Sequence, residues 1–149
     1  MKIPKIILLL LFLSSLAFSQ TKDSKKSEVA VSNPINSSPA YAEVLLRKVE
    51  LESSLEDLLV ELTNESPRVK ETRYELELIK KQLEKMRAMN PSDVPKLTLA
   101  LGKLIIRKVQ IEVDLWVLLQ RYTEEHEEVK RTRRKLTVFE DAIKEILGQ

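Results

Sequence analysis

The sequence contains no cysteine and only two glycines among its 149 residues. Without cysteine the chain forms no disulfide, so helix packing must hold the fold together. The two isolated glycines, Gly102 and Gly148, cannot form the glycine-rich loop that binds nucleotide phosphates. Aromatic residues make up only 5% of the chain, which is few for an enzyme core with a substrate pocket. These shortages, together with the lack of a nucleophile elbow, argue against an enzyme.

Charged residues make up 32% of the chain and hydrophobic residues 43%. The many Leu, Glu, Lys and Arg residues and the shortage of glycine favour helix over sheet. A length of 149 residues suits one domain. We therefore predict an all-α protein.

The first nineteen residues have the pattern of an export signal. Residues 1–5 carry two lysines, residues 6–13 form an unbroken apolar run, and residues 17–19 fit the small-x-small rule for a cleavage site. We predict a signal peptide at residues 1–19, cleavage before Gln20, and a periplasmic or secreted protein. The apolar run is shorter than the roughly 20 residues that a membrane span needs. In the alternative, the segment is kept as an anchor, and it is then the only contact with the membrane.

The charge of the predicted mature protein is balanced. The leader holds Lys2 and Lys5 and no acidic residue, and the whole chain has 25 basic and 23 acidic residues. Removal of the leader therefore leaves 23 of each sign, which argues against nucleic acid as a partner. The basic run at residues 130–135 has glutamates at helical spacing, so we interpret it as a solvated helix face. Binding of this run to an anionic lipid or glycan is the less favoured alternative.

The rest of the chain divides into a linker and four helices. Residues 20–40 hold five serines and two prolines and few large apolar residues, so we predict a disordered linker there. Beyond it, apolar residues recur at alternating steps of three and four, the spacing of coiled-coil helices. The predicted helices span residues 41–62, 67–89, 93–122 and 127–147. The predicted units are a first helical hairpin at 41–89, a connection at 90–95 and a second hairpin at 96–149.

The two hairpins are copies of one another. Residues 47–83 align without a gap on residues 107–143, and fourteen of the thirty-seven pairs are identical. The identities include Thr, Arg and Lys at positions that heptad spacing does not explain, so we infer a duplicated hairpin. Short bends make neighbouring helices antiparallel, and the four helices either close into one bundle or remain two hairpins that pair with another chain. The residues that we assign to the bends are Thr63, Ser66, Pro67, Val69, Thr123, His126 and Val129.

The acidic run around His126, residues 124–128, is the nearest approach to a metal site in the sequence. A histidine flanked by carboxylates can bind divalent cations. Neighbouring residues on a helix point in different directions, however, and the chain has no second histidine to complete a set. We interpret the run as a helix start, where acidic side chains meet the positive end of the helix dipole. No metal and no cofactor are predicted.

The third predicted helix is apolar over more than half of its circumference. A helix of this kind needs neighbours on several sides. We expect its extra apolar arc to contact either the other helices of a bundle or, as we favour, a second copy of the chain in a homo-oligomer. The sequence identifies no other protein partner. The residues of this candidate interface are Ile106, Val109, Val113, Trp116 and Val117.

The bends resemble those of the periplasmic hairpins of bacterial polysaccharide chain-length determinant proteins, also called polysaccharide co-polymerases, which often carry a Thr-x-x-His-Pro-x-Val pattern. The second copy matches at Thr123, His126 and Val129 with Glu127 in place of proline, and the first matches at Thr63, Pro67 and Val69 with Ser66 in place of histidine. Each residue has a local role, since Ser or His caps the following helix and proline suits its first turn. The resemblance implies a shared hairpin and a context in polysaccharide export. It does not extend to the transmembrane helices or the mixed α/β base of that family.

Together these features predict an exported, non-enzymatic protein of two tandem antiparallel hairpins that acts through protein–protein contacts. A scaffold or accessory of a cell-envelope assembly is the first expectation. A periplasmic holdase-type chaperone, which would grip unfolded proteins between its hairpin arms, is the alternative. It ranks second because the chain is neither strongly basic nor carries the Leu-Thr-x-x-Gln signature of known small helical holdases.

Overall fold

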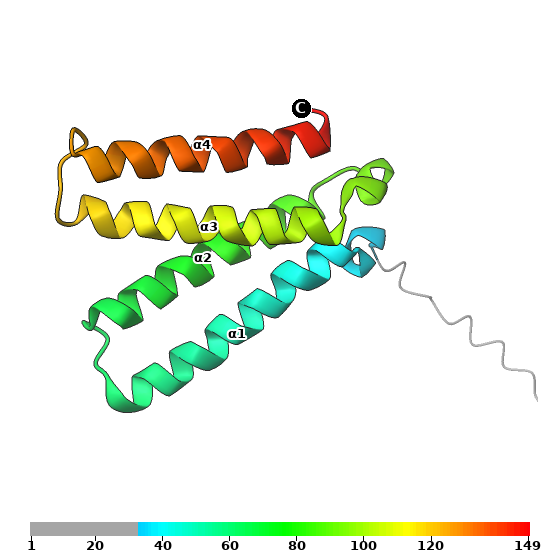
Figure 1. Ribbon diagram of the computed structural model, residues 1–149. Helices are drawn as coiled ribbons and strands as arrows, with labels where there is room; N and C mark the ends of the chain where they lie inside the picture. Colours follow the sequence, from blue (N-terminus) through cyan, green and yellow to red (C-terminus); the bar gives the residue numbers. More distant parts are fainter. Residues whose placement is uncertain (1–32) are drawn as a thin grey trace, which may run out of the picture. The chain divides into compact units, whose positions relative to one another are not determined.

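The computed structural model describes residues 33–149, and residues 1–32 lie outside this description. Between residues 33 and 149 the chain forms helices and no β-strand (Figure 1). The all-α prediction and the arrangement in antiparallel hairpins are confirmed. In chain order the elements are the 3₁₀ helix η1 (Pro34–Ser37), α1 (Pro39–Glu61), α2 (Pro67–Arg87), the 3₁₀ helix η2 (Pro91–Lys96), α3 (Leu99–Leu119) and α4 (Glu127–Leu147).

The four α-helices form two hairpins, hairpin 1 from α1 and α2, and hairpin 2 from α3 and α4. Within each hairpin the two helices pack along one another, and α3 also packs on both helices of hairpin 1. Figure 1 shows α3 between α4 and hairpin 1, with the two hairpins crossing at an angle. α4 packs chiefly on α3. α3 therefore has neighbours on the most sides, as its wide apolar arc predicts.

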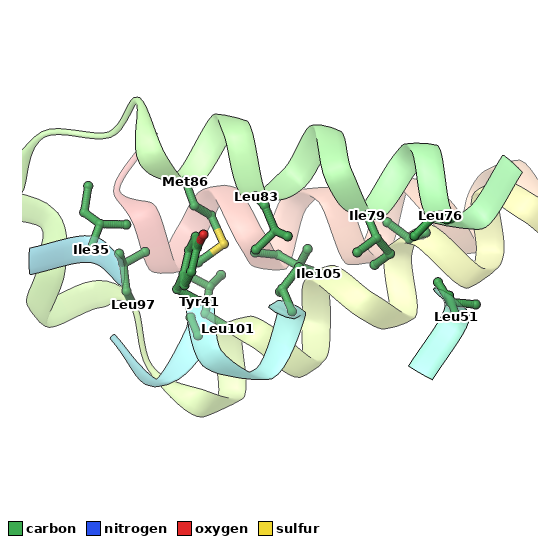
Figure 2. Close-up of a cluster of buried hydrophobic side chains, with 13 residues drawn as sticks. Ile35, Tyr41, Leu51, Leu76, Ile79, Leu83, Met86, Leu97, Leu101 and Ile105 are labelled. Atoms are coloured by element: carbon green, nitrogen blue, oxygen red, sulfur yellow. The ribbon is translucent and has the colours of Figure 1, made fainter. Parts of the chain in front are cut away.

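One hydrophobic core joins the two hairpins (Figure 2). Its side chains come from η1, α1, α2, the residue that follows η2, and α3. Removal of this apolar surface from water is the main favourable contribution to folding. The fully buried members of the core are Ile35, Ala40, Val44, Ile79, Leu97, Leu101 and Val109.

The segment before α1 is folded, so the prediction of a disordered linker is wrong for residues 33–40. These residues contain η1 and the first two residues of α1, and Ile35 of η1 is fully buried in the core. The segment is short and rich in serine and proline, which is why its composition suggests disorder. Its order comes from one large apolar side chain that fills a site made by distant residues. The rest of the predicted linker, residues 20–32, lies outside the described residues.

Hydrogen bonds fix the start of α1. The hydroxyl of Ser38 is buried and accepts a hydrogen bond from the amide of Tyr41 at 3.3 Å, which caps the helix. The amide of Ala40 donates to the carbonyl of Leu97 at 3.1 Å. This second bond ties the beginning of hairpin 1 to the beginning of hairpin 2.

The third helix begins later than predicted, at Leu99 instead of residue 93. Pro95 explains the difference, because proline has no amide to donate and disfavours the α conformation of the residue before it. The chain forms η2 there, and Thr98 then caps α3 by accepting a hydrogen bond from the amide of Leu101 at 3.3 Å. The ends of the other three predicted helices lie within two residues of the observed ends.

No helix within residues 33–149 is long and apolar enough to cross a membrane. The predicted signal peptide at residues 1–19 and the cleavage before Gln20 lie outside the described residues. Both stay predictions.

Candidate functional site

The two bends have the same backbone structure. In the first bend the amide of Ser66 donates to the carbonyl of Thr63 at 3.0 Å, and in the second the amide of His126 donates to the carbonyl of Thr123 at 3.1 Å. The next helix begins directly after Ser66 and directly after His126. The same turn is thus built from the same positions sixty residues apart, as a duplicated hairpin requires.

The residues that precede the second helix of each hairpin cap it differently. His126 Nδ1 accepts a hydrogen bond from the amide of Glu128 at 3.3 Å, and its ring stacks on Tyr122 with 4.0 Å between centroids. Ser66 has the equivalent position, but its side chain accepts no hydrogen bond from the first turn of α2. The expectation of a serine cap is therefore wrong at the level of the side chain. Pro67 occupies the first turn, where its fixed φ favours a helix start.

The valine that ends each bend motif is an anchor. Val69 in hairpin 1 and Val129 in hairpin 2 are both fully buried. Val129 is the one residue of α4 that is buried to this degree. The bend residues therefore act locally, by setting the turn and holding the start of the following helix.

The acidic residues beside the bends pair with basic residues of the following helix. Oε2 of Glu125 lies 2.7 Å from Nζ of Lys130, and Oε2 of the equivalent Glu65 lies 2.6 Å from Nζ of Lys70. The hydrogen bond from Lys70 lowers the pKa of Glu65 below its ordinary value. In the part of the chain that the structure describes, no three His, Asp or Glu side chains are placed to hold a metal ion. His126 instead caps α4 and packs on an aromatic ring.

The first half of α3, where the candidate interface begins, packs against hairpin 1 of the same chain. Val109 is fully buried, and Ile106 is partly buried against the core. α3 and α1 come very close at Gly102. An added Cβ atom there would lie 2.9 Å from Cβ of Glu43 and 3.0 Å from Cα of Ala40. The absence of a side chain at residue 102 is therefore what permits this approach.

The other end of the candidate interface also faces hairpin 1. The ring of Trp116 stacks on the ring of Tyr74 in α2, with centroids 4.9 Å apart. Val113 and Val117 line a shallow cleft together with Glu71 of α2. The chain thus covers much of the extra apolar arc of α3 from within, which is the intramolecular alternative of the two that the sequence leaves open.

An apolar face of α1, in contrast, is exposed in the described part of the chain. Leu45, Leu46 and Val49 are 38%, 55% and 53% exposed, and Ala42 one turn earlier is exposed as well. Their spacing of three and four residues places them on one side of the helix. We call these four residues the outer face of α1. An exposed apolar face of this kind is a candidate interaction site.

The repeat shows that the outer face of α1 is the counterpart of a covered surface. Its equivalents in α3 include Ile105 and Val109, which are 6% and 0% exposed. The prediction from sequence missed this face because it followed the apolar residues at alternating steps of three and four, such as Val44 and Leu51. These lie on the other side of α1. Comparison of the two copies position by position would have found it, since Leu46 matches Ile106 and Val49 matches Val109.

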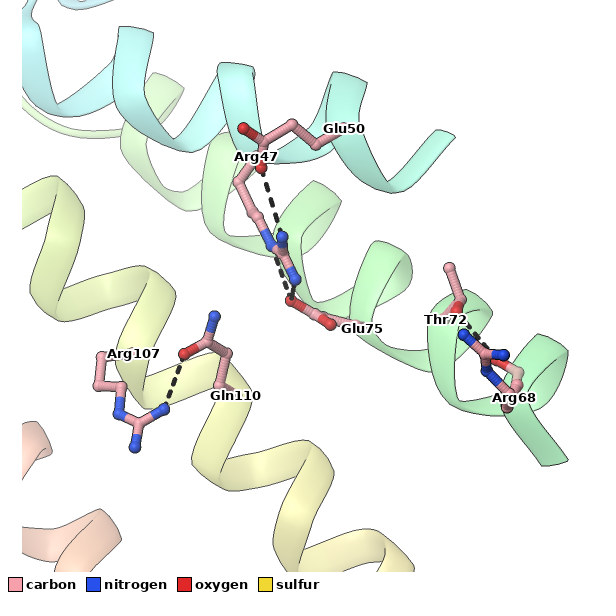
Figure 3. A network of polar contacts seen from close by, with 7 residues as sticks. All are labelled: Arg47, Glu50, Arg68, Thr72, Glu75, Arg107 and Gln110. Atoms are coloured by element: carbon pink, nitrogen blue, oxygen red, sulfur yellow. Dashed lines mark hydrogen bonds and ion pairs between the residues drawn. The ribbon is translucent and has the colours of Figure 1, made fainter. Parts of the chain in front are cut away.

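The two copies also differ in charge. Figure 3 shows Arg47 of α1 reaching across to Glu75 of α2, with Nη2 of the arginine 2.7 Å from Oε1 of the glutamate. The position equivalent to Glu75 in hairpin 2 is Lys135, which offers no carboxylate to the guanidinium of Arg107. Arg107 donates instead to Gln110 of its own helix at 2.9 Å (Figure 3). A position that is acidic in hairpin 1 has thus become basic in hairpin 2.

A second surface feature is a groove of about 410 Å³ between α2 and α4, with α3 as its floor. It exists because α4 packs chiefly on α3, which leaves a space between α4 and α2. Three lysines and one glutamate stand among its polar lining residues. The apolar lining residues are Met86, Met89, Leu97, Leu101, Ile105, Ile143 and Leu147.

The chain matches no protein-family model, no curated protein and no solved structure. The likeness of the two bends to chain-length determinant proteins stays a resemblance of one motif.

Proposed function

We propose that this protein is an exported, non-enzymatic helical-hairpin protein that acts through protein–protein contacts, as a scaffold or accessory of a cell-envelope assembly. The observation that carries the proposal is the outer face of α1, where Leu45, Leu46 and Val49 are exposed side by side. Full burial of one such side chain contributes about 1.5–3 kcal/mol. These three side chains are about half exposed, so a partner that covers them gains the remaining part of that contribution at each.

The chemistry of the outer face favours a protein over a small molecule. Small-molecule sites are concave and hold a few convergent polar groups that orient the ligand. The outer face is part of the surface of a single helix and is therefore convex. Its four residues carry no polar side-chain atom. Such a surface suits a helix or hairpin of another protein, which lays its own apolar stripe along it.

Export is supported by the sequence of residues 1–19, and the envelope context by the resemblance of the bends. We expect the native protein to begin at Gln20 and to fractionate away from the membrane. The intact mass of the protein purified from its producing cell measures this. A mass that includes Met1, found in the membrane fraction, would contradict cleavage and favour the anchor.

Site-specific photo-crosslinking in the producing cell tests the contact. A crosslinking amino acid at Val49 should yield a defined protein adduct, because Val49 lies in the outer face. The matched control is Glu84, an exposed position on α2 outside that face, and it should yield none. The adduct at Val49 should also disappear when Leu46→Glu places a charge in the face. Equal labelling at both positions would count against a specific contact.

The groove between α2 and α4 favours a second candidate, the holdase-type chaperone. Met86 and Met89 line it, and flexible methionine side chains adapt to varied apolar partners. A holdase would suppress the aggregation of a heat-unfolded protein through the groove, so Met89→Glu would abolish the effect. The change Leu46→Glu in the outer face would leave it intact, which separates the two functions.

A further inference from the structure

We propose that copies of this chain associate head to tail, with the outer face of α1 in one copy packed against hairpin 2 of the next. The inference rests on the proposed function of that face and names its partner, a second copy. Each joint would repeat the contact that α3 makes with hairpin 1 inside the chain. A contact of this kind joins two different surfaces, so a free copy must present both of them.

The first surface is the outer face of α1. Inside the chain, the equivalent face of α3 is the part that docks on hairpin 1, with Val109 fully buried. The duplication places side chains of the same kind at the same helical positions of α1. α1 therefore presents to solvent the surface with which α3 docks. The equivalent pairs are Leu45 and Ile105, Leu46 and Ile106, and Val49 and Val109.

The second surface lies on hairpin 2 and corresponds to the docking side of hairpin 1. On hairpin 1, that side includes Tyr74, which stacks on Trp116, and Leu78, which packs against the core. The equivalents on hairpin 2 are Arg134, whose side chain is 68% exposed and lies 3.3 Å from Oε1 of Glu127, and Val138, which is 65% exposed. Hairpin 2 thus repeats the docking side and leaves it open to solvent. We call it the docking side of hairpin 2.

The differences between the copies match one another across the proposed joint. Inside the chain, Trp116 of the docking helix meets Tyr74 of hairpin 1. The equivalent positions are Glu56 on the outer-face side of α1 and Arg134 on the docking side of hairpin 2. An aromatic pair within the chain therefore becomes a pair of opposite charges between copies. Both charged side chains are exposed in the single chain.

A second pair follows the same pattern. Val117 of α3 and Glu71 of hairpin 1 line one cleft. Their equivalents are Asp57 and Arg131, both exposed. In the single chain Arg131 also lines the cleft that holds Val117 and Glu71, and its exposed side chain remains available to Asp57 of another copy. The register of the joint is therefore argued chiefly from the pair of Glu56 and Arg134.

Sedimentation velocity of the full chain, as its producing cell makes it, tests the proposal. The average mass of the wild-type protein should rise with concentration and should not stop at a dimer, because each added copy leaves one surface of each kind open. Two variants block one surface each. They are the outer-face variant, Leu46→Glu with Val49→Glu, and the docking-side variant, Arg131→Glu with Arg134→Glu. Each should weaken association by roughly tenfold or more.

Mixing decides between this joint and other contacts. The two variants together contain one intact joint per pair, so an equimolar mixture should form a dimer and nothing larger. Addition of Glu56→Arg and Asp57→Arg to the docking-side variant should restore growth, because the charges are then exchanged across the joint. All six positions are exposed, and circular dichroism verifies that every variant is folded.

Three results would overturn the inference. The first is a wild-type protein that stays a monomer at high micromolar concentration. The second is a docking-side variant that still dimerises, which would indicate a symmetric contact between α1 helices. The third is an equimolar mixture that stays monomeric. A wild-type monomer that nevertheless crosslinks at Val49 to a different protein would overturn self-association and leave the proposed function standing.

Discussion

Replacement of Leu76 with alanine is expected to lower the free energy of unfolding by about 2–5 kcal/mol, the range found for buried leucines. Leu76 is 6% exposed and belongs to the core that joins the hairpins. Its repeat equivalent, Leu136 on α4, is only partly buried. The same change at Leu136 should therefore cost clearly less, although the two leucines have the same place in the repeat. Denaturant unfolding followed by circular dichroism measures both values.

Leu136 is the matched control for Leu76, because the two are the same residue type at equivalent positions of the repeat. If Leu76→Ala unfolds at the same denaturant concentration as the wild type, the buried apolar side of α2 does not contribute to the core. Equal losses at Leu76 and Leu136 would mean that α4 is as deeply packed as α2, contrary to the structure.

The change Gly102→Leu should destabilise the chain by about 1–3 kcal/mol or more, the range for overpacked sites. The built Cβ position lies 3.0 Å from both Cα and the carbonyl oxygen of Ala40. These are backbone atoms, which cannot turn aside as the end of a long side chain can. α3 must then move away from α1, and the side chains between them lose contact. The loss is measured by the same denaturant titration.

The repeat supplies the matched control for this second experiment. Ala42 has the same position in α1, and it is exposed. Ala42→Leu introduces the same side chain at the same helical position, so it should change stability by no more than about 0.5 kcal/mol, as exposed substitutions usually do. Protein concentrations in the low micromolar range keep any association out of the comparison. A similar loss for both variants would show that the close approach at Gly102 is not the cause.

The local features of the fold could be predicted from the sequence. The ends of α4 match the predicted ends, and both bends form where the repeated motif places them. These features depend on residues near one another in the chain, such as Val129 and the turn before it. The order at Ile35 could not be predicted in this way, because the site that buries it is built from distant residues. The late start of α3 was predictable in principle from Pro95.

The sequence predicts the apolar arc of α3 but neither what covers it nor the outer face of α1. The wide apolar arc of α3 indicates that something covers it, but a neighbour in the same chain and a neighbour in another copy bury the same side chains. Periodicity cannot tell the two apart, and the structure places Trp116 against Tyr74 of the same chain. The outer face of α1 has the opposite problem. Its apolar residues, such as Leu46, are ordinary for a helix until their counterparts in α3 are found to be buried.

The attachment of α4 to a single main neighbour has a consequence for the dynamics of the folded chain. The fully buried residues of the core that joins the hairpins come from η1, α1, α2, α3 and Leu97, and α4 adds only the partly buried Ile143, Ile146 and Leu147. Detachment of α4 would therefore leave that core in place, so this opening requires less free energy than global unfolding. The backbone amides of α4 should exchange with deuterated solvent earlier than those of α2. Each such opening also removes the α4 wall of the groove, so access to the methionines on its α2 side depends on the opening of one helix.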